Sequence, residues 1–237
     1  MTVENVLQSL KSLGSESTRK IFRNHGAPEN MYGVKVGDLK GIIKTLPRKK
    51  DHELSLALYD SGNSDAMYLA GLIADEKKIS PDDLRHWAEK ASWYMISEYT
   101  VAWVAADSPH GWALALEWIE SPVEQIASTG WSTLASWCTV RPDATLDLPA
   151  LEKLLDRVAN TIHNAPNRVR YTMNNFVIAA GICVLPLTEK AIATARAIGA
   201  VKVEMGGTAC KVPDAESYIE NARAKGRMGV KKKDARC

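Results

Sequence analysis

Hydrophobic residues recur every three or four positions along nearly the whole chain, which is the spacing of amphipathic α-helices. The clearest stripe contains Leu151, Leu154, Leu155 and Val158. Strict alternation, typical of a half-buried strand, is found only from Val201 to Met205. The pattern therefore predicts an all-α chain with a single short strand.

Several residues mark where the predicted helices begin and end. Ser80 and Ser121 each precede a proline and have a carboxylate three residues later. The serine hydroxyl caps free backbone amides, proline fits the first helical position, and the carboxylate favours the positive end of the helix dipole. Asp147 is a third predicted N-cap, and glycines such as Gly14 and Gly199 predict helix ends.

The predicted helices number about twelve or thirteen and form pairs joined by short turns. The pairs cover residues 2–24, 36–61, 64–90, 92–120, 122–163 and 167–198, and a last helix covers 214–224. One pair every ~35 to 45 residues is the period of HEAT-type repeats, although no strict sequence repeat is present. The rhythm predicts a right-handed α-α superhelix, a solenoid of about six HEAT-like pairs with a concave face.

Length and composition fit one folded domain. The 237 residues are 46% hydrophobic and 24% charged, which excludes a wholly disordered chain. We assign residues 1–224 to the HEAT-like repeat domain and 225–237 to a basic C-terminal tail, which glycines interrupt and which we expect to be flexible. The apolar runs are short and the N-terminus has no secretory pattern, so we expect no membrane contact.

The cysteines and histidines carry no recognisable ligand pattern. The four cysteines are widely spaced without a C-x-x-C pair, and the five histidines lack metal-ligand spacing. We therefore expect no metal and no other cofactor. A reduced cytoplasmic protein, present as a monomer, is the simplest interpretation.

Charge is segregated along the chain although the net charge is only +2. Residues 18–50 carry nine basic and two acidic side chains, residues 51–220 carry 13 and 23, and residues 221–237 carry seven and one. Basic segments on both sides of an acidic middle permit phosphate binding, and a solvated basic surface explains the same pattern. The candidate DNA-binding residues are Lys35, Lys40, Lys44, Arg168, Arg170, Lys231, Lys232 and Lys233.

Aromatic residues are concentrated in the middle of the chain. All seven tryptophans lie between Trp87 and Trp137. Most are expected to be core, and Trp103, Trp118 and Trp137 in particular sit among aliphatic or small neighbours. Tyr94 and Glu98 are four residues apart and share one helix face, where an aromatic ring beside a carboxylate favours a cation. A salt bridge from Glu98 to a neighbouring helix is the alternative.

The run Met31–Lys40 and the stretches Asp65–Gly71, Ser128–Ser132, Met173–Phe176 and Gly226–Lys233 resemble the AlkD-like DNA alkylation repair enzymes. The resemblance covers essentially the whole chain. It implies a solenoid of HEAT-like repeats that cradles duplex DNA in its concave face. It also implies a monofunctional glycosylase that releases 3- and 7-alkylated purines, and alkylated duplex DNA as the partner.

The resemblance also suggests where such a site would lie. The aromatic and carboxylate of the family's active helix fall on Tyr94 and Glu98, which become the candidate catalytic residues, with Glu98 stabilising an oxocarbenium-like sugar. Trp93, Trp131 and Asn175 become candidate pocket-lining residues, and Asn175 stands where active members carry an aromatic. Three functions remain open: a glycosylase, a DNA-binding relative without base excision, and a protein-interaction scaffold without a nucleic-acid role.

Overall fold

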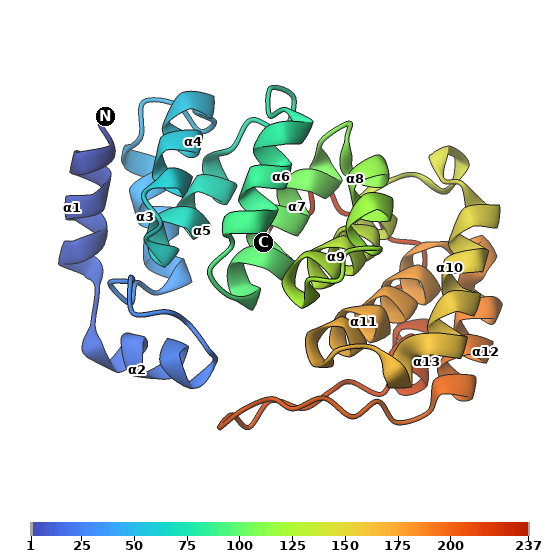
Figure 1. Cartoon of the computed structure of the whole chain (residues 1–237). Helices are drawn as coiled ribbons and strands as arrows, with labels where there is room; N and C mark the ends of the chain where they lie inside the picture. Colours follow the sequence, from blue (N-terminus) through green and yellow to red (C-terminus); the bar gives the residue numbers. More distant parts are fainter. Residues whose placement is uncertain (1, 237) are drawn as a thin grey trace.

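The computed structural model describes residues 2–236, which are built from helices joined by short turns (Figure 1). The α-helices are α1 (Val3–Leu13), α2 (Glu16–Asn24), α3 (Val36–Thr45), α4 (His52–Asp60), α5 (Ser64–Ile73), α6 (Pro81–Lys90), α7 (Ala102–Asp107), α8 (Gly111–Trp118), α9 (Glu124–Val140), α10 (Leu148–Thr161), α11 (Asn167–Cys183), α12 (Thr188–Ile198) and α13 (Ala215–Ala224). A π-helical segment, η1 (Met95–Val101), runs directly into α7. The short 3-10 turns are η2 (Asp143–Thr145), η3 (Ile162–Asn164) and η4 (Leu185–Leu187).

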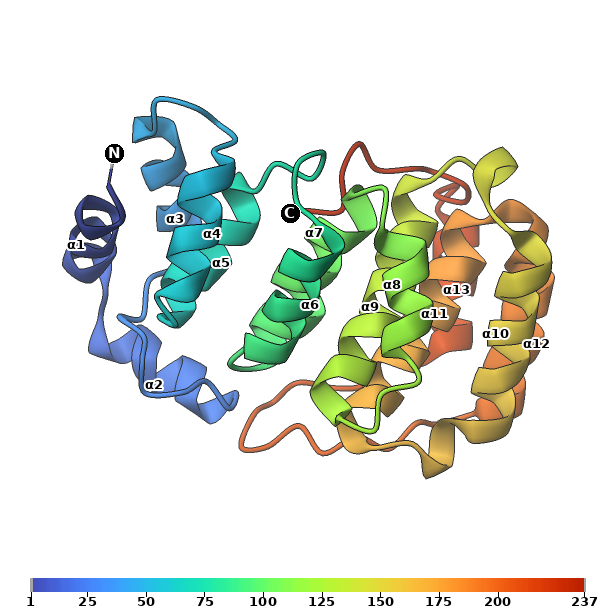
Figure 2. The same cartoon turned by 45° about the horizontal axis from the view of Figure 1, so that its top comes forward.

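The predicted helix pairs are confirmed, and they form two layers. In one layer α5, η1 with α7, α9, α11 and α13 pack side by side. The other layer contains α4, α6, α8, α10 and α12, which lie in front of the first layer or beside it in Figure 2. This stacking of neighbouring pairs, which buries one hydrophobic cluster in the N-terminal half and a second in the C-terminal half, is the predicted α-α superhelix.

Close packing between neighbouring helices rests on large buried aromatic side chains. The rings of Tyr59 and Trp87 stack with centroids 4.2 Å apart, and the Tyr59 hydroxyl donates to the Trp87 carbonyl at 2.6 Å. Trp103 and Trp118 are buried, as predicted, at 9% and 3% exposure. Trp137 was predicted to be buried as well, but it is only half-buried near the end of α9, where the guanidinium of Arg141 lies 4.1 Å from its ring centroid.

Two of the three predicted helix starts are confirmed. Ser80 and Asp83 form a capping box at α6, and the Asp147 side chain accepts from the Ala150 amide at the start of α10. The start at Ser121 is wrong, because α9 begins only at Glu124. The Ser121 hydroxyl instead accepts from the Val123 amide at 3.2 Å, two residues on, which makes a local turn.

The predicted strand from Val201 to Met205 is wrong. The segment is extended, and no strand is formed within residues 2–236. Its backbone pairs with a side chain instead of another strand. The side-chain Nδ2 of Asn167 donates to the Glu204 carbonyl at 2.9 Å, and the backbone amide of Glu204 donates to Asn167 Oδ1 at 2.7 Å.

The basic C-terminal tail differs from the flexible arm that its glycines suggested, because residues 229–236 lie against the ends of the helix layer. The Gly229 amide donates to Ile182, and the Lys232 amide donates to Thr139, each at 2.8 Å. Ala235 is buried at 2% exposure. The tail returns to the middle of the molecule, where the C-terminus is marked in Figure 1.

The connection between α2 and α3 is held by a buried carboxylate. Asp65, at the start of α5, is 4% exposed. It accepts the backbone amides of Tyr32, Gly33 and Val34 at 2.6, 3.0 and 2.9 Å. A charged acceptor satisfies three amides that would otherwise be buried without partners. Asp65 therefore fixes the first helices to the rest of the layer.

No single helix in residues 2–236 is both long and apolar enough to cross a membrane. One pair of segments, Asn167–Cys183 and Leu185–Ile198, reaches that length and composition only when taken together, and it is bent by 116°.

Candidate functional site

Tyr94 and Glu98 lie at the start of a π-helical segment, where their spacing had predicted an ordinary α-helix. Tyr94 precedes η1 and Glu98 lies in its first turn. Single-turn π-helical distortions are rare and occur often at functional sites. Tyr94 is half-buried, whereas Glu98 is only 5% exposed.

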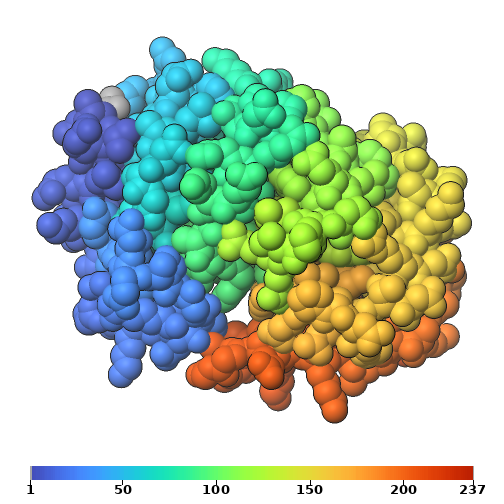
Figure 3. Space-filling model, viewed as in Figure 1, coloured from blue at the N-terminus to red at the C-terminus, as the bar shows by residue number. Residues whose placement is uncertain are grey.

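A cleft of about 400 Å³ opens beside Tyr94. One wall is the end of α2 with the loop Arg23–Gly26, and the facing wall is the extended segment from Glu204 to Gly206. Figure 3 shows these walls as blue and orange surfaces with a gap between them at the lower edge. Glu98 does not reach the cleft, whose remaining lining residues are Met95, Tyr99, Arg168, Tyr171 and Cys210. We call this space the tyrosine cleft.

Arg168 covers the Glu98 carboxylate. Its Nε donates to Glu98 Oε1 at 2.8 Å, and its Nη2 pairs with the other carboxylate oxygen. This is the two-point fork that guanidinium and carboxylate groups form. The Glu98 side chain is 2% exposed and that of Arg168 is 20% exposed. Both carboxylate oxygens are therefore occupied, and the pair is largely removed from water.

Two tyrosine rings hold the guanidinium of Arg168. Its central carbon lies 4.5 Å from the centroid of Tyr94 and 4.5 Å from that of Tyr171. The faces of aromatic rings attract cations. The Tyr94 hydroxyl is hydrogen-bonded to His25 Nδ1 at 3.0 Å, which ties the ring to the α2 wall. Arg168 is thus the cation of an aromatic and acidic cage.

Burial determines the protonation behaviour of these groups. It raises the pKa of Glu98 above the usual carboxylic-acid value, and the hydrogen bonds and charge of Arg168 oppose that rise. Burial also raises the pKa of Tyr94, which the charge of Arg168 opposes, so its hydroxyl stays protonated at neutral pH. Tyr94 therefore offers a neutral phenol beside the guanidinium of Arg168.

The three candidate pocket-lining residues lie outside the tyrosine cleft. Trp131 is 1% exposed and packs on Phe176 with centroids 5.4 Å apart, so it belongs to the core. Trp93 is 9% exposed and packs between Phe22 and Tyr94. Asn175 is half-buried on α11 and lines none of the described clefts. Large aromatic side chains near this site are used for packing between helices.

The basic candidates are divided between different parts of the surface. Only Arg168 lines the tyrosine cleft, while Arg170 is half-buried nearby on α11. Lys35 is exposed at the start of α3. Lys40, Lys44 and Lys233 line a separate, larger cleft.

Lys231 and Lys232, which were the other basic candidates, help to hold the tail. Lys231 donates to the Cys138 carbonyl at 2.9 Å and pairs with Asp143 at 2.7 Å. The side chain of Lys232 is exposed, while its backbone amide is bound to Thr139.

Sequence reasoning missed the contact between Arg168 and Glu98, which are 70 residues apart in the chain. It also missed His25 and Tyr171 as members of the cleft. One signal was available: Arg168 and Tyr171 are three residues apart and share a face at the start of a helix. In residues 2–236 no three His, Cys, Asp or Glu side chains are grouped so that they could hold a metal ion.

Comparisons with known proteins agree on one kind of relative. The sequence profile described as "DNA alkylation repair enzyme" matches residues 6–212. Proteins of Listeria innocua and Listeria monocytogenes, Lin0241 and Lmo0209, are each 38% identical over 227 residues, which cover 94% of this chain and 98% of theirs. Both are described as uncharacterized.

A solved structure is similar over the full length of both chains, with a TM-score of 0.91 and 37% identity. It represents "a new family of proteins related to the HEAT-like repeat DNA glycosylases with affinity for branched DNA structures".

Proposed function

Because the chain belongs to the DNA alkylation repair enzyme family, we propose that it is a DNA-binding protein which holds DNA at the tyrosine cleft and does not excise alkylated bases. The observation that carries this proposal is the pairing of both Glu98 oxygens with Arg168. Stabilising an oxocarbenium-like sugar requires a carboxylate aimed at the reacting carbon. Here the guanidinium stands between that carboxylate and the cleft.

The cage formed by Tyr94, Tyr171 and Glu98 already holds a cation, the guanidinium of Arg168. A cationic alkylpurine would be attracted by the faces of Tyr94 and Tyr171 and by the charge of Glu98. The guanidinium of Arg168 already fills that position, 4.5 Å from each ring. A lesion would have to displace an arginine from a buried ion pair, which costs several kcal/mol. The cage is therefore satisfied without a substrate.

The cleft retains the means to bind DNA without chemistry. The rings of Tyr94, Tyr99 and Tyr171 line it together with Arg168. These half-buried rings line a cleft, aromatic rings stack on bases regardless of sequence, and arginine contacts phosphates. Unpaired or splayed bases expose the faces that such rings require, and a solved relative has affinity for branched DNA. We therefore propose DNA with a branch point as the preferred ligand.

Two assays with the purified chain test this function. Fluorescence anisotropy compares a four-way junction with a linear duplex of the same sequences, and chromatography measures methylpurine released from alkylated DNA. We expect tighter binding to the junction and no release above the protein-free rate. Release that Glu98→Gln abolishes would instead establish the glycosylase.

A matched pair of variants locates the binding site. Tyr171→Ala removes a ring of the cleft, and Tyr218→Ala removes a ring that is 55% exposed on α13, outside the cleft. Stacking of one base on an aromatic ring contributes about 1–3 kcal/mol. Tyr171→Ala should weaken junction binding by at least about 5-fold, and Tyr218→Ala should leave it unchanged. Equal affinities of the two variants would exclude the tyrosine cleft as the site.

A further inference from the structure

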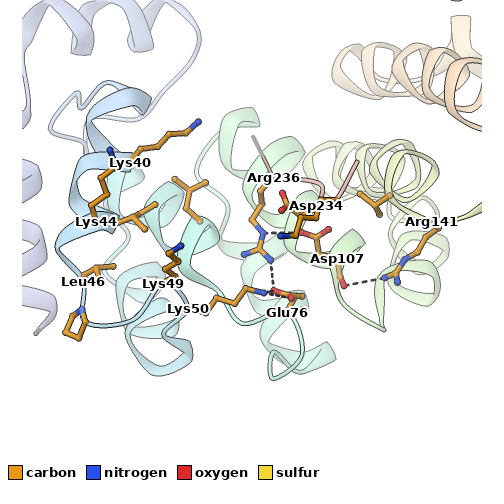
Figure 4. Close-up of a pocket in the computed structure, with 15 residues that line it drawn as sticks. Lys40, Lys44, Leu46, Lys49, Lys50, Glu76, Asp107, Arg141, Asp234 and Arg236 are labelled. Atoms are coloured by element: carbon orange, nitrogen blue, oxygen red, sulfur yellow. Dashed lines mark hydrogen bonds and ion pairs between the residues drawn. The ribbon is translucent and has the colours of Figure 1, made fainter. Parts of the chain in front are cut away.

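A second and larger cleft, of about 810 Å³, is lined by basic side chains from two distant segments of the chain (Figure 4). Residues 40–50 form one wall, and the C-terminal tail with the ends of α5, α7 and α9 forms the other. Its charged residues are Lys40, Lys44, Lys49, Lys50, Arg141, Lys233 and Arg236 together with Glu76, Asp107 and Asp234. We call this space the basic cleft.

Structural contacts account for three of the seven cations. Arg236 pairs with Glu76 at 2.6 Å and with Asp107 at 3.1 Å. Lys50 also pairs with Glu76. Arg141 donates to the carbonyls of residues 106–108, which end α7. These contacts hold the walls together and fix the tail, so the cleft has a defined shape.

The other four cations make no ion pair or side-chain hydrogen bond that would stabilise the fold of residues 2–236. These four residues, Lys40, Lys44, Lys49 and Lys233, are exposed. They surround an opening in which the carboxylates of Glu76 and Asp107 are already paired with Arg236. Like charges around one opening raise the local potential, which Asp234 offsets only in part, and a bound anion relieves the repulsion.

The basic cleft is separate from the tyrosine cleft, and the two share no lining residue. Tyr94 lies at the start of η1, whereas Asp107 lies at the end of α7, which continues the same helix. At ~1.5 Å per residue this helix is about 20 Å long. The tyrosine cleft therefore opens at the start of the helix formed by η1 and α7, and the basic cleft opens at the end of that helix.

We infer that the basic cleft is a second DNA-binding surface, at which Lys40, Lys44, Lys49 and Lys233 contact backbone phosphates. This rests on the proposed function, because it assumes that DNA is the ligand of the chain. A backbone strand fits the observations because it presents anions in a row, and the lysines approach from both walls. Two surfaces at opposite ends of the helix formed by η1 and α7 allow the chain to hold two duplex arms at once.

The test compares two triple variants with the same loss of charge. The first replaces Lys40, Lys44 and Lys233 with alanine. The control replaces Lys11, Lys90 and Lys153, which are also exposed and line neither cleft. None of the six side chains has a structural partner within residues 2–236, so both variants should fold, as circular dichroism would verify.

The measurement is the dependence of junction affinity on salt. Each phosphate contact contributes about 0.9 to the slope of log affinity against log salt. The basic-cleft variant should lose about 2 to 3 from that slope, whereas the control should keep the wild-type value. Equal slopes in the two variants would overturn the inference and leave the proposed function intact. Failure of the wild type to bind any DNA would overturn both.

Competition separates DNA from free phosphate as the natural ligand. Wild type bound to a labelled junction is titrated with unlabelled duplex or with inorganic phosphate at equal ionic strength. Displacement by duplex at concentrations where phosphate has no effect supports the DNA surface. Equal displacement by both, counted per phosphate group, would show a site for small anions and contradict the inference.

Discussion

The ion pair between Arg168 and Glu98 predicts a large and pH-dependent loss of stability when only one partner is removed. Arg168→Met keeps the length of the side chain and removes its charge. Glu98 then remains buried, with its side chain 2% exposed and without a cation. Removing one partner of a buried pair typically costs about 3–5 kcal/mol, and we expect a loss in that range at pH 8.

The direction of the pH dependence follows from the pKa of Glu98. Burial already raises that pKa, and Arg168 opposes the rise. Without Arg168 the pKa of Glu98 rises further, so the folded variant binds more protons than the unfolded chain above about pH 4.5. Stability therefore falls as pH increases toward the folded pKa. The deficit of Arg168→Met should be small near pH 5 and largest at pH 8.

Urea unfolding followed by tryptophan fluorescence at both pH values measures this deficit. Arg85→Met is the matched control, because Arg85 pairs with Glu117 at a surface where both side chains are more than 40% exposed. Such pairs contribute about 0.2–1 kcal/mol. The combination of Glu98→Gln with Arg168→Met should recover part of the loss, since no buried charge remains. A deficit no larger than that of Arg85→Met, or one independent of pH, would refute this account.

Four further substitutions test the packing of the chain, the first three by chemical denaturation and the last by hydrogen exchange. Trp118→Ala should cost about 3–5 kcal/mol, and Trp137→Ala clearly less because its ring is half-buried; equal losses would contradict the assigned burial. Asp65→Asn should cost at least about 2 kcal/mol by weakening three hydrogen bonds to buried amides, and an unchanged midpoint would exclude that role. Arg236→Ala leaves Asp107 without its cation and should speed hydrogen exchange of the tail amides; exchange equal to wild type would show that other contacts hold the tail.

The helices were predictable because each buries one face, and that requirement is written into the spacing of apolar residues. Local sequence patterns predicted structure less well where the same residues can form more than one arrangement. Ser121 and Pro122 carry the pattern of a helix start, yet the serine forms a turn before α9. Val201 to Met205 alternates like a strand, but the side chain of Asn167 pairs with the backbone of Glu204. A partner distant in the sequence decided the second of these cases.

The proximity of Tyr94 and Glu98 was predictable from the sequence, but the partner of Glu98 was not. Four-residue spacing placed Tyr94 and Glu98 on one face, and the alternative of a salt bridge to another helix proved to describe Glu98. The identity of that partner depends on how η1 and α11 both pack against α9, which no local pattern encodes. Trp131 and Asn175 were assigned from order along the chain. Their surroundings are set by packing against α11 and its neighbours, which leaves both outside the tyrosine cleft.

The segregated charge of the sequence has a structural explanation in the same layer geometry. Acidic residues of the long middle segment are paired across the outer helices, as with Glu117 and Arg85 or Asp156 and Lys190. Those pairs neutralise charge locally, at the surface of the second layer. The basic segments instead meet at one cleft, because the tail returns to the end of the layer where residues 40–50 lie. A chain with a net charge of only +2 therefore concentrates positive charge at one place, and that concentration, not total charge, is what attracts a polyanion.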